Sequence, residues 1–280
     1  MSGFRPRFFA GQESLSSSPG GSPTPGADPR VDSGAAPGAA SGADLSGREL
    51  TLGTDDSHHA LRVLRLQRGD DCEVVVGAAV YAASVSWADD PVRVMLTGRL
   101  EGIAAGAAYQ AQVGLVQSLA RPALIDQVLE KGTEVGTSFF VLVPAFHSPR
   151  GSEPAGAERL ARWRRIVLEA AKQSKQVVVP QAEVMDSVEQ VIRDLGARGV
   201  LSLVLDPAAS VGLEERLASR AARGARLALW IGPESGWTAA ESEQFRAAGI
   251  EAVRLGRSIL RTETAGPVAV AVARLVMRDW

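Results

Sequence analysis

Two glycine-containing segments near the end of the chain carry the residue types best suited to chemistry. The first, residues 232–236, reads Gly-Pro-Glu-Ser-Gly, and the second, residues 256–264, begins at Gly256 and contains an arginine and a glutamate. Glycine lets the backbone approach a ligand closely, so two such loops favour binding of a small molecule through main-chain groups. Glycine loops alone are a weak signal, and ordinary turns are the alternative.

Arg261 and Glu263 are the candidate chemical groups of the second segment. They lie in an otherwise uncharged run, Ser-Ile-Leu-Arg-Thr-Glu-Thr-Ala at 258–265, which favours a buried or half-buried polar pair. A carboxylate can act as a general base, and a guanidinium can stabilise negative charge on a carbonyl oxygen. A purely structural pair that ties the loop to the next helix is the alternative, and the sequence does not separate the two.

Strand ends are expected to deliver both segments. The apolar run 227–231 predicts a strand, and a second strand is expected near 251–255. Between them, Thr238 with Glu241 fits a capping box that begins a helix, and Gly249 is well placed to end it. In open α/β sheets, ligands bind beyond the carboxyl ends of the strands, so the two segments should share one site.

Strands and helices alternate from residue 111 onward. Strands are expected at 111–118, 138–145, 177–180 and 200–205, and helices at 122–135, 157–175, 187–196 and 211–222. This alternation predicts a mainly parallel sheet with helices on both faces. A final helix, about 263–277, is apolar nearly all round, which favours a covering partner; burial within one subunit is the alternative.

The first hundred residues predict a small β domain, expected to be a barrel. Strands are expected at 5–9, 72–76, 81–87 and 92–96. A short helix is expected at 57–68, with Ala60, Leu61, Leu64 and Val63 facing inward and Arg62, Arg65 and Arg68 facing outward. Residues 11–43 are mostly Gly, Ser, Pro and Ala, and such a composition predicts a disordered insert. Residues 102–108 are predicted to be a linker.

Composition limits the class of protein. A chain of 280 residues that is 45% hydrophobic is expected to fold as one or two domains with a substantial core. The net charge of −2 gives no global basic field, so nucleic-acid binding would need a local patch. One cysteine and three histidines make no disulfide framework and no recognisable metal site. No apolar run reaches membrane-spanning length and no signal peptide is recognisable, so we expect a cytoplasmic protein.

The two C-terminal segments together resemble a known family. IGPESGWTAAE at Ile231 and LGRSILRTETA at Leu255 are similar to the RsmE family, bacterial methyltransferases that act on N3 of a uridine in small-subunit (16S) ribosomal RNA. The resemblance extends through RPRFF at Arg5, HHALRVLRLQRGD at His58, KGTEVG at Lys131 and AAKQSKQVVVP at Ala170. Apart from the insert, it covers nearly the whole chain in the same order.

The resemblance implies a fold, a cofactor and partners. The expected fold is a SPOUT-class α/β domain with a trefoil knot, here residues 109–280, preceded by an RNA-binding PUA-like β-barrel domain, residues 1–101. S-adenosylmethionine is the expected methyl donor, and the expected partners are a second copy of the chain and 16S ribosomal RNA or the small ribosomal subunit. The periodicity itself does not indicate a knot, which is rare in proteins.

The resemblance also assigns site residues. Glu263 is the candidate base for the N3 proton of uridine, and Arg261 is the candidate stabiliser of charge on the carbonyl oxygens of the base. The residues expected around the cofactor are Leu229, Ile231, Gly232, Pro233, Glu234, Gly236, Leu255, Gly256, Ser258, Ile259 and Leu260. Those expected to contact RNA are Arg5, Arg7, His59, Arg62, Arg65, Lys131 and Lys172. Asp206, before Pro207, is a weaker candidate for the donor pocket, and no metal is expected.

Several residues expected to contact RNA also have a simple structural explanation. Arg62 and Arg65 also fit the solvated face of a helix, and Lys131 also fits an exposed ion pair with Glu134 near a helix end. Basic residues of the 157–175 helix, Lys172 among them, are usually just solvated.

Two positions depart from the family pattern. Ser235 replaces the first glycine of a pair, which would strain the loop by roughly 1 kcal/mol if that position needs a positive φ. Gln176 stands where the family normally carries an arginine. Both departures slightly favour a rival function, a catalytically silent RNA-binding protein that retains the fold. A nucleotide-binding enzyme of ordinary doubly wound fold is a second rival, but its GxGxxG or P-loop signature is missing from the expected place.

Overall fold

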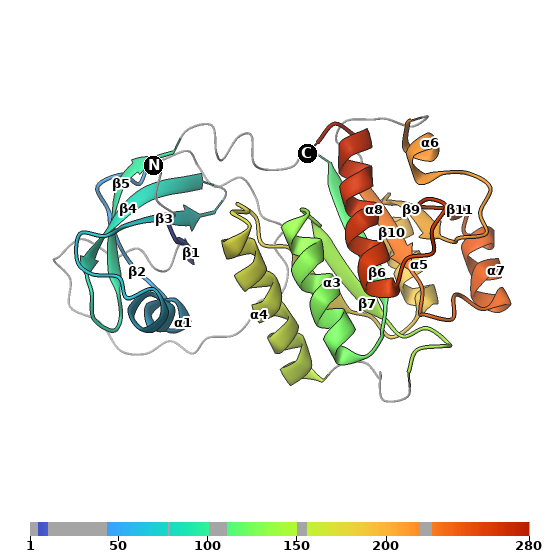
Figure 1. Cartoon of the computed structure of the whole chain (residues 1–280), viewed down its shortest axis with the longest axis horizontal. Coiled ribbons are helices and arrows are strands. Elements are labelled where there is room, and N and C mark those ends of the chain that lie inside the picture. The colour runs from blue at the N-terminus through green and yellow to red at the C-terminus, as the bar shows by residue number, and fades with distance from the viewer. Residues whose placement is uncertain are drawn as a thin grey trace. The chain divides into compact units, whose positions relative to one another are not determined.

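Two compact units, Met1–Ala107 and Ala108–Trp280, make up the chain. The computed structural model describes residues 5–10, 44–77, 79–100, 111–149, 156–218 and 226–279. The predicted linker at 102–108 and the whole of the predicted insert at 11–43 lie outside the described residues. Figure 1 labels the helices and strands of both units.

A curled five-stranded sheet forms the N-terminal unit. Its strands are β1 (Arg7–Ala10), β2 (Glu49–Thr51), β3 (Asp71–Val76), β4 (Ala79–Trp87) and β5 (Arg93–Arg99), in the order β1-β3-β4-β5-β2. β1 runs parallel to β3, and the other neighbouring strands are antiparallel. β1 and β2 are both edges of the described sheet, so it resembles half of the barrel that the sequence predicts.

A short helical segment follows β2 and differs from the predicted helix at 57–68. The α-helix α1 (Thr54–His58) starts earlier and passes directly into a π-helical turn, His59–Val63. It stops early because Arg65 adopts a left-handed conformation, with φ of 54°, and the Leu66 N–H donates back to the Ala60 carbonyl at 2.9 Å. Ala60 is buried as expected, whereas Val63 faces solvent, contrary to expectation.

Six parallel strands form the sheet of the C-terminal unit, as predicted. They are β6 (Gln112–Ser118), β7 (Phe139–Val143), β8 (Gln181–Val184), β9 (Leu201–Leu205), β10 (Arg226–Ile231) and β11 (Glu251–Val253), in the order β11-β9-β10-β6-β7-β8. The short strand predicted at 177–180 is wrong, because pairing begins only after Pro180. Proline has no N–H to donate to a ladder, so a strand starts more readily behind it.

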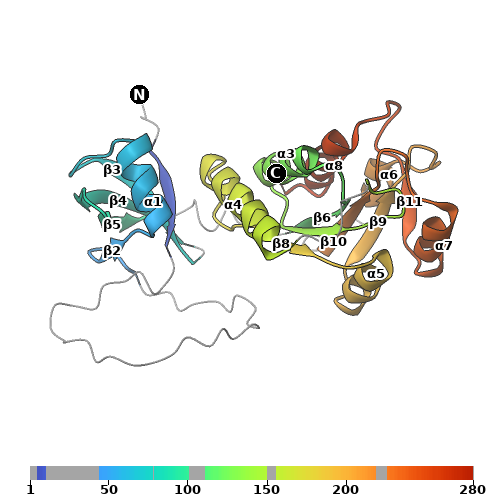
Figure 2. The same ribbon diagram turned by 90° about the horizontal axis from the view of Figure 1, so that it is seen from below.

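Helices cover both faces of this sheet (Figure 2). One face shares its core with α3 (Pro122–Glu134), α4 (Ala157–Gln173), α6 (Leu213–Ala218) and α8 (Thr262–Val276). The other packs against α5 (Val188–Ala197) and α7 (Ala239–Ala247). Successive strand residues point to opposite faces, so Leu229 faces the first core and Trp230 the second.

Local signals around the last two strands behave as predicted. Thr238 and Glu241 form both hydrogen bonds of a capping box at the start of α7. Gly249, with φ of 71°, follows the end of that helix. In the described ranges, no helix is long and apolar enough to cross a membrane.

Candidate active site

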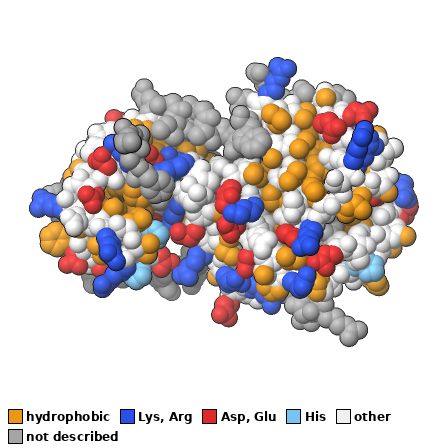
Figure 3. Space-filling view, in the orientation of Figure 1, with side chains coloured by type: hydrophobic (Ala, Val, Ile, Leu, Met, Phe, Trp, Pro, Cys, Tyr) orange, Lys and Arg blue, Asp and Glu red, His pale blue; other side chains and the backbone are white. Residues whose placement is uncertain are grey.

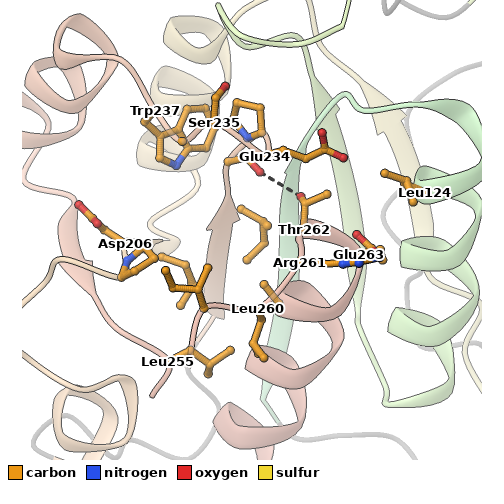
Figure 4. A pocket seen from close by; sticks show the side chains of 18 of the residues that line it. Leu124, Asp206, Glu234, Ser235, Trp237, Leu255, Leu260, Arg261, Thr262 and Glu263 are labelled. Carbon is orange, nitrogen blue, oxygen red and sulfur yellow. Dashed lines mark hydrogen bonds between the residues drawn. The ribbon is translucent and has the colours of Figure 1, made fainter. Parts of the chain in front are cut away.

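A pocket of about 700 Å³ lies at the carboxyl ends of β9, β10 and β11 (Figure 4). Its walls are the turn at 206–207 after β9, the loop 232–237 after β10, and much of the segment 255–263 after β11. The first turn of α3 adds Arg121 and Leu124. The two glycine-containing segments therefore meet in one site, and its volume is in the range of small-molecule pockets.

Ten of the eleven residues predicted around the cofactor line this pocket. They are Ile231, Gly232, Pro233, Glu234, Gly236, Leu255, Gly256, Ser258, Ile259 and Leu260, and the weaker candidate Asp206 lines it as well. The prediction for Leu229 is wrong, because its side chain lies fully buried in the core between the sheet and its helices. Leu229 faces the same side as Ile231 but lies two residues deeper in the strand, away from the open edge.

Several lining residues were missed, including Arg121, Leu124, Trp237 and Thr262. Arg121 and Leu124 follow the carboxyl end of β6, which neighbours β10, and ligands collect at such edges. Their position just after this strand could therefore have predicted that they line the pocket.

The loop after β10 is a tight turn. The Gly236 N–H donates to the Pro233 carbonyl at 2.8 Å, and Gly236 itself takes the positive φ of 78°. Ser235 is not among the residues with positive φ, so the strain expected from serine does not arise. A side chain at Gly232 would crowd the loop, because a Cβ there would lie 3.0 Å from Nε1 of Trp237.

A buried chain of hydrogen bonds joins the two loops. Thr262 Oγ1 donates to the Gly232 carbonyl at 3.0 Å and accepts from Gln117 Nε2 at 2.9 Å. Gln117, at the end of β6, is fully buried, and its Oε1 has no hydrogen-bond partner within the described chain. This brace fixes the start of α8 against the loop after β10.

Arg261 and Glu263 occupy the α8 end of the pocket (Figure 4). Arg261 is the N-cap residue of α8, and Glu263 lies in its first turn, where a carboxylate also complements the helix dipole. Within the described residues, neither side chain forms an ion pair or a side-chain hydrogen bond. Both are therefore available to a bound molecule, and the tie expected from a purely structural pair is not formed.

One ion pair crosses the pocket mouth. An Nη atom of Arg121, at the start of α3, lies 3.4 Å from a carboxylate oxygen of Glu234, in the loop after β10. Both side chains are mostly exposed, and exposed pairs contribute little to stability. A ligand can therefore separate them at small cost.

The residues predicted to contact RNA in the N-terminal unit have unequal access to solvent. Arg62 and Arg65 are exposed and have no ion-pair partner among the described residues. His59 is half-buried, and Arg5 forms an exposed pair with Asp71 at 2.9 Å.

The burial of Arg7 contradicts its predicted contact with RNA. The residue is 5% exposed and pairs with Glu73 at 2.7 Å, which ties β1 to β3. Phe8, the next residue, points into the core of the unit, so Arg7 lies on the opposite face of β1, where its charge is used in the pair with Glu73.

The two lysines predicted to contact RNA are both paired with acids. Lys131 is exposed and lies 2.8 and 2.9 Å from Glu130 and Glu134, whose carboxylates raise the pKa of its ammonium group. Lys172 is largely buried as a side chain and pairs with Glu169 at 2.8 Å. For Lys131 the structure matches the exposed ion pair that is the alternative to an RNA contact. Across the described part of the chain, no three His, Cys, Asp or Glu side chains group as metal ligands.

Comparisons with known proteins point to one family. A sequence model of the RNA methyltransferase domain matches residues 108–274. A Mycobacterium bovis protein named Ribosomal RNA small subunit methyltransferase E is 29% identical over 240 residues, which is 84% of this chain and 89% of that protein. A Synechocystis protein of the same name is 29% identical over 223 residues, 79% of this chain and 71% of that protein.

The fold also matches a solved structure. The crystal structure of a Ribosomal RNA small subunit methyltransferase E from Neisseria gonorrhoeae, bound to S-adenosyl methionine, aligns with a TM-score of 0.76. It covers 98% of both chains at 22% identity, a level that establishes the fold alone. The region matched by the family includes every residue that lines the pocket.

Proposed function

This chain belongs to the RNA methyltransferase domain family, and we propose that it transfers a methyl group from S-adenosylmethionine to N3 of a uridine in small-subunit ribosomal RNA. The observation that carries the proposal is the meeting of the loops 232–237 and 255–263 in one pocket. Such a substrate is found in the cytoplasm, where we propose that the protein acts.

The lining of the pocket suits S-adenosylmethionine, which when bound supplies a methyl group on a positively charged sulfur. Leu205, Ile231, Leu255 and Leu260 offer apolar surface for an adenine ring. A Cβ built on Gly256 meets no atom within 4 Å, so the space beside that backbone is open. The backbone around Gly232 and Gly256 can thus hydrogen-bond the polar edge of the ring.

Arg261 and Glu263 suit the acceptor. Uridine N3 carries a proton and is a poor nucleophile until it is lost, and its loss spreads negative charge onto the two carbonyl oxygens of the base. We assign Glu263 as the base that takes this proton and Arg261 as the cation that stabilises the charge. Their location on the pocket wall and their lack of described partners support these roles.

RNA affinity is assigned chiefly to the N-terminal unit, which we propose to be a PUA-like domain. Its curled sheet, β1-β3-β4-β5-β2, corresponds to part of such a barrel. Arg62 and Arg65 would contact phosphates, because the guanidinium fork matches phosphate oxygens. Arg5 and His59 are assigned to the same surface in a supporting role.

We further propose the trefoil knot of the SPOUT class for the C-terminal unit. The turn after β9 and the segment 211–213 both hydrogen-bond to the end of β11. The Asp206 N–H donates to the Val253 carbonyl, and backbone bonds join Arg254 to Val211 and Leu213, all at 2.9–3.0 Å. The helix that follows β11, α8, packs against β6 and β10.

A second copy of the chain is the proposed partner of α8. Val268 and Leu275 on its outer face are 37% and 66% exposed, and hydrophobic side chains gather over this helix (Figure 3). Ala269 and Ala273 already cover the sheet from its inner side. Light scattering should give the mass of a dimer at micromolar concentration, and a monomeric mass would reject this part of the proposal.

The rival function, a silent RNA-binding protein, loses the support that Ser235 gave it. Ser235 introduces no positive-φ strain, and Gln176 is half-buried with its amide near the Thr133 carbonyl, at 3.5 Å.

Incubating the protein with methyl-labelled S-adenosylmethionine and small-subunit RNA, free or assembled, tests the proposal. We expect label in RNA with the unmodified protein and almost none with Glu263→Gln. Calorimetry that shows no S-adenosylmethionine binding, together with intact RNA binding, would favour the silent protein.

A further inference from the structure

The turn after β7, residues 145–148, exposes a large aromatic side chain to solvent. Phe146 is 79% exposed, far more than the other described phenylalanines, most of which lie in cores. Because all six strands are parallel, the carboxyl end of β7 lies on the same edge of the sheet as the pocket. An exposed phenylalanine adds nothing to the core, and its ring is open to a bound molecule.

The turn is held in place by hydrogen bonds. The Ala145 N–H donates to Ser148 Oγ at 3.0 Å, and the Ser148 N–H donates to the Ala145 carbonyl at 2.9 Å. The Phe146 N–H donates to Glu241 Oε1 at 3.0 Å. Phe146 is therefore presented on a fixed backbone, which lowers the entropy lost when it binds.

The same glutamate connects this turn to the pocket. Glu241 is buried, and its Oε2 accepts from the N–H and the hydroxyl of Thr238, both at 2.8 Å. Thr238 follows directly after the pocket loop 232–237. One carboxylate thus fixes the position of Phe146 relative to a wall of the pocket.

The chemistry of the turn fits a nucleobase. His147 stands edge-on to the Phe146 ring, with centroids 5.2 Å apart and planes at 86°, and it is exposed as well. Ala145 is buried and Ser148 is half-buried, so the exposed surface is one or two rings wide rather than a broad apolar patch of the kind that binds a protein. Unpaired RNA bases are bound by stacking on such isolated aromatic rings.

We propose that Phe146, supported by His147, stacks against an unpaired base next to the target uridine. This inference rests on the proposed function, because it takes RNA as the substrate of the neighbouring pocket. It adds a base contact to the phosphate contacts assigned to Arg62 and Arg65. A base held there would keep the RNA strand along the edge of the sheet that carries Arg261 and Glu263.

The test uses three variants of the full chain. Phe146→Ala should weaken binding of a small-subunit RNA fragment about tenfold or more, the usual effect of removing a stacking ring. Phe146→Trp should keep or improve the affinity, because its ring is larger. Val178→Ala, an exposed apolar residue just before β8 and away from the carboxyl edge, serves as the control and should change nothing. S-adenosylmethionine binding, measured by calorimetry, should be equal in all three.

The outcomes separate this inference from the proposed function. If Phe146→Ala binds and methylates RNA as the unmodified protein does, the stacking role is overturned while the methyltransferase stands. If Phe146→Ala instead lowers the mass seen by light scattering and leaves RNA affinity unchanged, the ring contacts protein and the inference fails. If the unmodified protein transfers no methyl group to RNA, the proposed function fails first.

Discussion

At the scale of single residues, two glycines shape the pocket in opposite ways. Gly232 leaves room for the Trp237 indole, which a Cβ would touch at 3.0 Å, whereas Gly256 borders open space. A side chain at Gly232 would therefore disturb the loop itself. A side chain at Gly256 would project into space that we assign to the cofactor.

Gly256→Val should abolish S-adenosylmethionine binding without unfolding the protein. Gly256 lines the pocket and a Cβ built there meets no protein atom, so the added isopropyl group should compete with the cofactor, and we expect at least a tenfold weaker Kd in calorimetry. Gly98→Val is the matched control, because its Cβ also meets nothing within 4 Å, but in β5 of the other unit. Equal affinity in a folded Gly256→Val protein would move the cofactor elsewhere.

Glu263→Gln should reduce kcat by roughly 10²–10⁴, the usual contribution of a general base. Because the side chain has no described protein partner, thermal stability and S-adenosylmethionine affinity should change little. Single-turnover methyl transfer measures the effect directly. Unchanged kcat would assign Glu263 to the helix dipole alone, and Arg261→Lys would then become the variant of interest.

At the scale of elements, the sequence was informative where a local signal decides the structure. The capping box of Thr238 and Glu241 and the glycine after α7 depend on neighbouring residues only, and both are present. The pocket could also be anticipated, because alternating strands and helices put strand ends at one edge. Periodicity did not place β8 or the π-helical turn, since Pro180 shifts the start of β8 and the left-handed Arg65 ends the helical segment early.

The remaining wrong or missing site predictions depend on which residues become buried when the chain folds. Leu229 and Ile231 share a strand face, and sequence alone does not tell which of them reaches the open edge. Arg7 and Arg5 both read as basic residues of a first strand, but only the pairing of β1 with β3 buries Arg7 against Glu73. Gln117 and Thr262 belong to strand and helix ends that meet only in the folded chain.

Arg274 in α8 should be essential for stability. It is fully buried, pairs with Asp279 at 2.9 Å and donates to the Gly136 carbonyl and to Ser138 Oγ at 2.8 and 3.0 Å. Arg274→Met should lower the free energy of unfolding by about 3–5 kcal/mol, because the Gly136 carbonyl loses its charged donor and the largely buried Asp279 carboxylate loses its cation. Denaturant titration measures this, with exposed Arg193→Met on α5 as the control. A loss below about 1 kcal/mol would show that the site repacks.

At the scale of the whole molecule, catalysis and RNA affinity are assigned to different units. The predicted domains 1–101 and 109–280 meet in a linker that lies outside the described residues, and the two compact units divide between Ala107 and Ala108. The net charge of −2 means that attraction for RNA must come from local cations rather than from the overall charge.

Replacing Arg62 and Arg65 together by alanine should weaken RNA binding and flatten its dependence on salt. Each lost phosphate contact removes released counterions, so the slope of log K against log salt should fall by about one to two units. Arg193→Ala with Arg198→Ala changes the net charge equally on α5 and should leave the slope as it is. S-adenosylmethionine affinity should not change in either protein. If replacing Arg62 and Arg65 leaves the salt slope unchanged, their surface is an ordinary solvated helix face that does not contact phosphates.

The most direct test of the central claim is to map methylated uridines in small-subunit ribosomal RNA from cells with and without this protein. Nucleoside mass spectrometry should show one 3-methyluridine lost on deletion, restored by the unmodified chain and not by Gly256→Val. Identical 3-methyluridine content in cells with and without the protein would contradict the account.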